Sequence, residues 1–211
     1  MIEPVNKKEA KRIETRKRVL AAATHLFARL GYHKTTIQDI AYHIGMTTGA
    51  VFHHYNSKAD ILDDVVAELD QSFDPYTTYL AKTHAGYNAM VYGIMDIFLD
   101  RFFNHPDTII ALASLAAEFS GIRGPVIVKV QAAYDRFVDS FEAALDRIDP
   151  KPSNRAAAIC FISALQGLAL QALVRDGEIE VDDLVKGFLS LVTPDQKDPP
   201  ERISEHAPGR I

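Results

Sequence analysis

The chain has 211 residues, of which 47% are hydrophobic and 24% are charged, so it holds enough apolar side chains to bury a sizeable core. Its single cysteine, Cys160, excludes an intramolecular disulfide and a zinc site built from several cysteines. The net charge of −5 would argue against a nucleic-acid partner if the charge were evenly spread.

The charge is unevenly distributed along the chain. Residues 1–60 carry 10 Lys and Arg residues against 5 Asp and Glu residues, whereas the remaining 151 residues carry 13 basic and 23 acidic residues. Binding a polyanion requires a locally basic surface and not a basic whole. The N-terminal part is therefore the candidate for a nucleic-acid partner, although a solvated helix end would give the same charge pattern.

Several features favour a cytoplasmic protein with no membrane partner. No apolar run approaches the roughly 18 residues that span a bilayer, and residues 1–18 lack the apolar stretch of a signal peptide. A lone cysteine is typical of a reducing compartment. Cys160 stands between Ile159 and Phe161, which favours a buried and unreactive thiol.

Helical periodicity dominates from the N-terminus onward, and we expect an all-α fold. A first helix is predicted over residues 7–30, and Gly31 ends it because glycine accepts a positive φ. Thr35 or Thr36 caps a second helix, and Thr36 and Asp39 have the spacing of a capping box. The turn at Gly45 leads into a third helix, from Thr47 or Thr48 to His54. Ser57 then caps a long fourth helix.

The rest of the chain predicts a larger helical body. Its helices are expected over residues 84–104, 106–119, 125–147, 153–175 and 181–192. The final residues contain three prolines and few apolar side chains, which is typical of a disordered tail. We therefore expect three parts: a head at 1–60, a ligand-binding and dimerisation body at 61–194, and the tail at 195–211.

The first three helices, with a glycine turn between the second and the third, have the order of a helix-turn-helix unit. An apolar stripe on the second helix packs it against the first, which leaves the third helix facing outward. The third helix begins with the small polar run Thr47–Ala50. Small residues there allow the helix N-terminus to enter a major groove, where its N–H groups face phosphates.

These residues resemble a known family. The segments Ala21–Tyr32, Thr35–Ala41 and Ile44–Leu62 closely resemble the head of the TetR (tetracycline-repressor) family, over about residues 13–65. The resemblance implies a homodimer that binds a pseudo-palindromic operator in double-stranded DNA. The residues that match DNA-contacting positions are Thr36, Thr47, Thr48, Gly49, Phe52, His53, His54 and Lys58.

Two of these positions depart from the family pattern. Phe52 stands where the family often has Tyr, so a hydroxyl that could bond a phosphate is missing. Thr48 stands where a basic residue is common, so the guanine contact of a Lys or Arg is missing.

By the same resemblance, the body holds a ligand pocket among its helices. Such pockets are mostly apolar, with few polar anchors. The body has no basic cluster, which favours a small neutral or mildly polar hydrophobic effector. The candidate lining residues are Met90, Met95, Phe98, Phe102, Phe119 and Phe137, and the candidate polar anchors are His84, Asn88, Asp96 and Glu118.

The last two predicted helices combine small alanines with large apolar residues, a composition that suits a dimer interface. The candidate interface residues are Phe161, Leu165, Leu168, Leu184 and Phe188. Burial within a single chain would produce the same pattern.

The sequence predicts a transcriptional repressor that a small ligand releases from its operator, with no enzymatic activity, no cofactor and no metal. An activator or a ligand-independent helix-turn-helix regulator is the nearest alternative. An enzyme would need a catalytic constellation, and no Ser-His-Asp motif, phosphate loop or metal-ligand spacing is present. A purely structural oligomerisation module would leave the outward third helix and the basic N-terminus unexplained.

Overall fold

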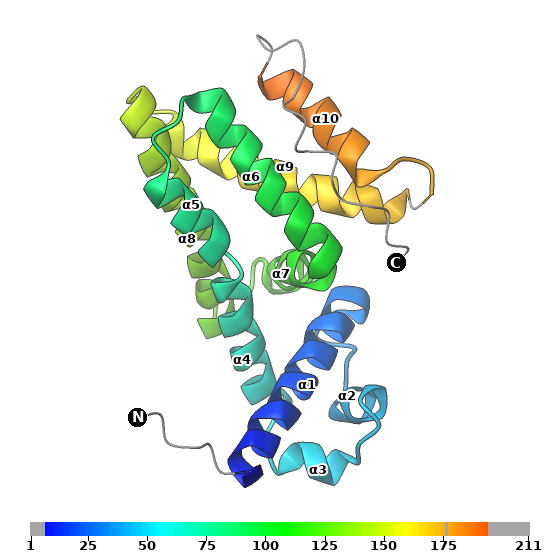
Figure 1. The fold of residues 1–211 in the computed structure, drawn as a ribbon. Coiled ribbons are helices and arrows are strands. Elements are labelled where there is room, and N and C mark those ends of the chain that lie inside the picture. The colour runs from blue at the N-terminus through cyan, green and yellow to red at the C-terminus, as the bar shows by residue number, and fades with distance from the viewer. Residues whose placement is uncertain (1–6, 176, 194–211) are drawn as a thin grey trace. The chain divides into compact units, whose positions relative to one another are not determined.

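The computed structural model describes residues 7–175 and 177–193. Within these ranges the chain forms ten α-helices and no strand, which confirms the all-α fold expected from the sequence (Figure 1). The chain divides into two compact units. Of the described residues, the first contains 7–72 and Ile110–Ala133, and the second contains Phe73–Ile109, 134–175 and 177–193. The tail predicted at 195–211 lies outside the described residues, and the functional boundary at residue 60 stays a prediction.

The first unit is built on the long helix α1. Its helices are α1 (Lys7–Leu30), α2 (Ile37–His43), α3 (Thr48–Phe52) and α4 (Lys58–Gln71), with residues 110–133 of α7 (Pro106–Phe119) and α8 (Pro125–Ile148). Apolar residues at helical spacing fill its centre, among them Val19, Phe27, Ile40, Ile61 and Val65, each with no exposed surface. Helices as short as α2 and α3 are unstable alone, so burial of their apolar side chains against the rest of the unit stabilises them.

The N-terminal caps predicted at Thr36 and Ser57 are confirmed. Thr36 caps α2 through the reciprocal capping box with Asp39, and Ser57 caps α4. Thr47, which the sequence placed at the start of the third helix but not as a cap, caps α3. Gly31 ends α1 with a φ of 83°. A Cβ atom at Gly31 would lie 2.1 Å from Oε1 of Glu118, so the position needs glycine for space as well as for conformation.

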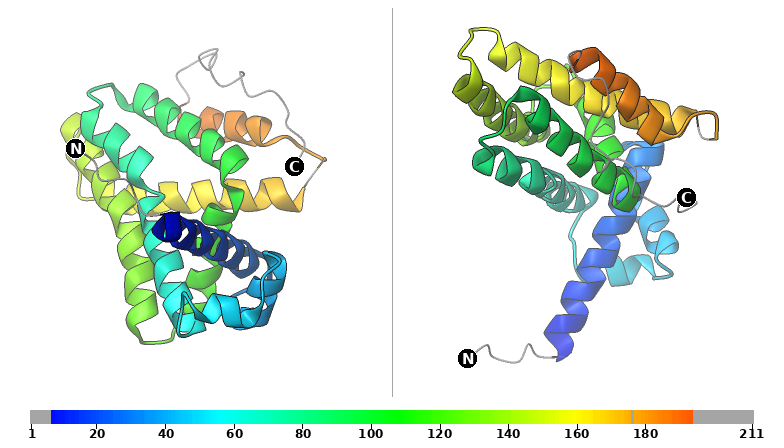
Figure 2. Two further views of the ribbon diagram at one scale, coloured as in Figure 1. Left: turned by 60° about the horizontal axis from the view of Figure 1, so that its bottom comes forward. Right: turned by 45° about the horizontal axis from the view of Figure 1, so that its top comes forward.

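The second unit contains α5 (Asp74–Lys82), α6 (Tyr87–Asn104), the first residues of α7, most of α8, α9 (Asn154–Val174) and α10 (Val181–Val192). Helices α9 and α10 lie side by side (Figure 2). A chain of aromatic contacts runs through its core, with Phe137 against Phe73, Tyr76, Phe141 and Phe161 at ring-centroid distances of 5.6 to 6.5 Å.

Some sequence expectations need correction. Helix α5 was not predicted; it begins after Phe73, whose side chain makes no capping bond, and it carries a proline in its first turn. Helix α6 begins at Tyr87 and not at residue 84. Cys160 is exposed and not buried, because on a helix it points about 100° away from the buried Phe161.

The expectation that no segment could span a membrane is also wrong. By length and composition alone, α9 is long and apolar enough to cross one. The criterion is a weak one, because a core helix of a soluble protein meets it too. Helix α9 buries Ala158, Phe161, Leu165 and Ala169 within this chain.

Candidate nucleic-acid interface

Helix α3 combines a buried inner side with an exposed outer side. Val51 has no exposed surface and anchors the helix in the first unit. Gly49 and His53 are exposed, and 49% of the Phe52 surface is accessible. Thr47 Oγ1 accepts a hydrogen bond of 3.2 Å from Ala50 N, so one N–H group of the first turn is already satisfied. The helix therefore offers a narrow surface that contributes little to packing.

The turn before α3 holds the helix at a fixed angle to α2. Gly45 has a φ of 66°, and the N–H of Met46 donates to the carbonyl of Ala41 at 2.9 Å. At the other end of α2, the capping box lowers the pKa of Asp39, chiefly because Thr36 donates through its hydroxyl and its backbone N–H to the carboxylate. Thr36, which was predicted to contact DNA, is exposed at the start of α2.

Lys58 has a structural role that the sequence did not reveal. Its Nζ donates to the carbonyls of Tyr32 at 3.0 Å and Thr35 at 2.9 Å, and lies 4.1 Å from the centre of the Tyr32 ring. The side chain is half-buried. These bonds tie the start of α4 to the turn between α1 and α2. Contact with a phosphate stays a prediction, and an ammonium group has a third hydrogen to offer.

His54 follows the exposed His53 directly after α3 and is half-buried. Burial, followed by the positive charges of Arg16 and Arg12, lowers the pKa of its imidazole, which keeps the ring neutral at pH 7. Its Nδ1 is buried without a hydrogen-bond partner among the described residues. Arg16 donates to the His54 carbonyl at 3.0 Å. A neutral ring can still donate one hydrogen bond to a phosphate oxygen.

Tyr55 is a core residue, 4% exposed. Its hydroxyl donates to Asp64 Oδ2 at 3.1 Å, and burial raises its pKa. Asp64 also pairs with Arg16, whose guanidinium lies 4.4 Å from the centre of the Tyr55 ring. This trio links α1, the end of α3 and α4. No local pattern in the sequence signals it, since the partners are up to 48 residues apart.

Glu118 and Phe119, at the end of α7, hold the turn after α1. Glu118 Oε2 accepts a 2.7 Å hydrogen bond from the N–H of Tyr32, and Phe119 lies 5.5 Å from the rings of both Tyr32 and His33. Both residues were expected in a ligand pocket. Their contacts show a structural role at this turn, and a role in ligand binding stays a prediction.

The N-terminal half of α1 carries exposed basic side chains. The side chains of Lys7, Lys8, Lys11, Lys17 and Arg18 are exposed. Tyr42, at the end of α2, is 88% exposed and was not singled out from the sequence. Exposed lysine and arginine side chains of this kind can contact a phosphate backbone.

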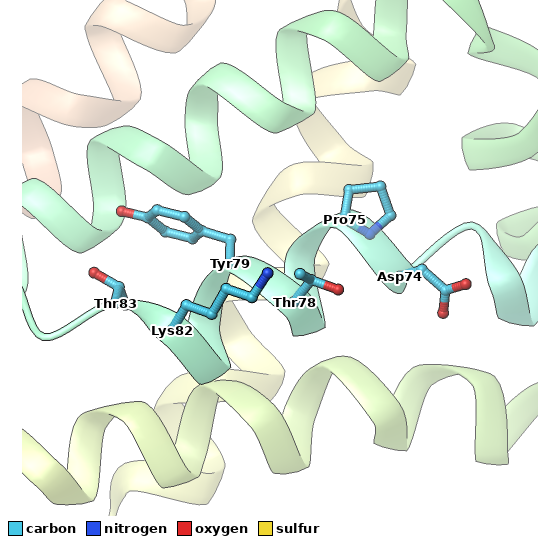
Figure 3. Close-up of a pocket in the computed structure, with 6 residues that line it drawn as sticks. All are labelled: Asp74, Pro75, Thr78, Tyr79, Lys82 and Thr83. Carbon is cyan, nitrogen blue, oxygen red and sulfur yellow. The ribbon is translucent and has the colours of Figure 1, made fainter.

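The predicted ligand residues of the second unit form its core. Met90, Met95, Phe98, Phe102 and Phe137 are each at most 4% exposed. None of them lines the two hollows found in this unit. The larger, of about 550 Å³, runs along the outer side of α5, where the Tyr79 hydroxyl donates to the Ala89 carbonyl (Figure 3). Of the candidate anchors, His84 and Asp96 are exposed.

The predicted dimer residues differ in exposure, and their role in a dimer stays a prediction. Phe161 and Leu165 are buried within the single chain. Leu168, Leu184 and Phe188 are half-buried. The exposed large apolar side chains of α9 and α10 are instead Ile159, Leu170, Val174 and Leu191.

Residues 19–65 match the family model for bacterial regulatory proteins of the tetR family. Over 61 residues the chain is 37% identical to the transcriptional regulator TtgR of Pseudomonas putida, a match that covers 29% of each protein. Over 68 residues it is 36% identical to the transcriptional repressor KstR2 of Rhodococcus jostii, covering 32% of this chain and 33% of that protein. The sequence match therefore spans about a third or less of the length of these relatives.

The similarity in structure extends further. The fold resembles that of the MbdR regulator from Azoarcus sp. CIB with a TM-score of 0.73 and 22% identity, covering 83% of this chain and 95% of that one. At this identity the likeness concerns the fold, so the helical body has the same architecture as that regulator.

Proposed function

Because the chain belongs to the TetR family of bacterial regulatory proteins, we propose that it is a dimeric, sequence-specific DNA-binding repressor, released from its operator by a small hydrophobic ligand. It would act in the cytoplasm on a pseudo-palindromic site. The relatives with matching heads are named as transcriptional regulators, and KstR2 is named as a repressor.

The observation that carries the proposal is the two-sided character of α3. Val51 anchors the helix from behind, while Gly49, Phe52 and His53 are exposed. An apolar ring is costly to leave in water, and about half of the Phe52 surface, 49%, is accessible. In a major groove the same ring can contact a thymine methyl group, and His53 can bond a base edge or a phosphate.

A dimer would present two copies of α3 to the two halves of a pseudo-palindromic site. Two heads must reach major grooves about one turn, roughly 34–36 Å, apart. The exposed apolar side chains Ile159, Leu170 and Val174 on α9, with Leu191 on α10, provide surface for an isologous contact. Small neighbours such as Gly167 and Ser163 are exposed on the same helix and would allow close approach.

A binding experiment with DNA flanking the protein's own gene tests the proposal. We expect a protected palindrome, an affinity that falls steeply with salt, and a dimer by sedimentation. The double variant Phe52→Ala/His53→Ala should lose at least about tenfold in operator affinity, equivalent to about 1.4 kcal/mol. Both residues are exposed, so its helix content should match that of the wild type.

The matched control is Gln71→Ala, an exposed change at the end of α4 in the same unit. It should bind the operator as the wild type does. Equal operator affinity of the double variant and the control would count against α3 as the reading element.

A further inference from the structure

A second hollow in the second unit has the features of a binding site. It measures about 320 Å³ and lies where the N-terminus of α6, the C-terminus of α8 and the N-terminus of α9 meet. This volume is at the lower end of the range for small-molecule pockets, roughly 300–1,000 Å³. A ligand of one or two fused rings suits that space.

Aromatic side chains form the wall of this hollow. Phe141 and Phe161 are buried and meet edge to face, with ring centroids 4.8 Å apart. At the mouth, Tyr87 and Ile148 are 36% and 43% exposed. Covering these side chains would remove apolar surface from water at about 25 cal/mol per Å². A ring would also gain edge-to-face contacts with the phenylalanines. The wall therefore favours a ring over an extended chain.

Asn154 supplies a directed polar group. The residue is 7% exposed, and its Nδ2 donates to Asp146 Oδ1 at 2.7 Å and to the Asp149 carbonyl at 3.0 Å. Both partners are acceptors, so the amide nitrogen must face them and the orientation of the amide is fixed. Its Oδ1 accepts no hydrogen bond from the described residues. A ligand that carries a donor can form a hydrogen bond with this oxygen.

The charges around the hollow exclude an anionic ligand. Lys151 at the rim is paired with Asp149, and Asp146 lies beside Asn154. Among the lining residues, the one cation is therefore already paired with a carboxylate. A carboxylate or phosphate ligand would lose more hydration than a neutral hydroxyl and would find no unpaired cation in this lining.

We propose that this hollow binds a small neutral ring compound that carries a hydroxyl group, of the phenol or naphthol class. The ring lies against Phe141 and Phe161, and the hydroxyl donates to Asn154 Oδ1. The role of this compound as an effector depends on the regulatory function proposed above, but its binding does not.

Titration with 2-naphthol tests the proposal. The chain contains no tryptophan, so naphthol fluorescence excited beyond the tyrosine band is free of protein emission. We expect saturable binding to the full-length protein in the absence of DNA. Naphthalene, which lacks the donor, and 2-naphthoate, which is anionic, should each bind at least about tenfold more weakly. Equal binding of naphthalene would overturn the assignment of Asn154 as hydroxyl acceptor.

A variant that fills the hollow provides the second measurement. Ala157 lines the hollow yet is exposed, so Ala157→Leu occupies the space without disturbing the core. It should weaken 2-naphthol binding at least about tenfold. Ala143→Leu, an exposed change on α8 outside the hollow, is the control and should leave binding unchanged. Unaltered affinity in Ala157→Leu, or absence of saturable binding to the wild type, would refute the site.

The two proposals can fail separately. If the protein binds operator DNA but not 2-naphthol, only the proposed ligand site is refuted. If it binds 2-naphthol with the expected variant pattern but recognises no DNA, only the proposed repressor function is refuted.

Discussion

The two compact units are stabilised by different kinds of interaction. In the first unit, directed polar bonds join segments far apart in the sequence: Lys58 to the Tyr32 carbonyl, Arg16 to Asp64, and Glu118 to the Tyr32 N–H. In the second unit, a run of aromatic rings centred on Phe137 fills the core. Directed bonds fix orientation, which a reading surface needs, whereas ring packing contributes more free energy but tolerates rearrangement.

The largest expected effect lies in the second unit. Phe137→Ala removes a fully buried ring from the centre of the aromatic run and should lower the free energy of unfolding by about 3–5 kcal/mol. Chemical denaturation measures this loss. Val128→Ala, on the same helix at a position 64% exposed, is the control and should change the free energy by less than about 0.5 kcal/mol. A small loss in Phe137→Ala would show that this core is not held by ring packing.

A smaller effect is expected where the first unit depends on directed bonds. Lys58→Met keeps the length of the side chain but leaves the carbonyls of Tyr32 and Thr35 without their donor, at a cost of about 1.5–3 kcal/mol. Hydrogen exchange should rise in the turn between α1 and α2 and stay unchanged in α9. Ala59→Met, an exposed change one residue later, serves as the control. Unchanged exchange in that turn would argue that Lys58 is free for another partner.

The smallest effect concerns pH. Burial lowers the pKa of His54 below its ordinary value, so the unfolded chain binds a proton at a higher pH than the folded chain does. Stability should therefore fall as the pH drops below about 6.5 and level off once the folded protein is protonated. Melting temperatures of the wild type and His54→Gln between about pH 7 and 5 measure this, and the variant should lose part of the slope. Identical slopes would place the sensitivity elsewhere.

The same contrast explains what the sequence could predict. The caps at Thr36 and Ser57 have acidic partners three residues away, Asp39 and Asp60, so their spacing is visible in the chain. The bond from Glu118 to the Tyr32 N–H spans 86 residues and leaves no local pattern. The burial of one helical residue also does not predict the burial of the next, since Phe161 is buried while Cys160 beside it is exposed.

The body was harder to predict for a physical reason. Its apolar residues recur at helical spacing whether they line a cavity or fill a core, so composition did not separate Met90 and Phe98 from pocket residues. The hollow at Asn154 is built from three helix ends, and only their arrangement in space brings Phe141 and Phe161 beside it.

Helix α3 has five residues, fewer than a helix needs to persist by itself in water. Its shape is imposed by Val51 behind it and by Thr47 at its start, while Gly49, Phe52 and His53 take little part in packing. The side chains that face outward are therefore separable from those that build the helix. Under the proposed function, exchanging them offers a route to heads with altered operator preference on an unchanged framework.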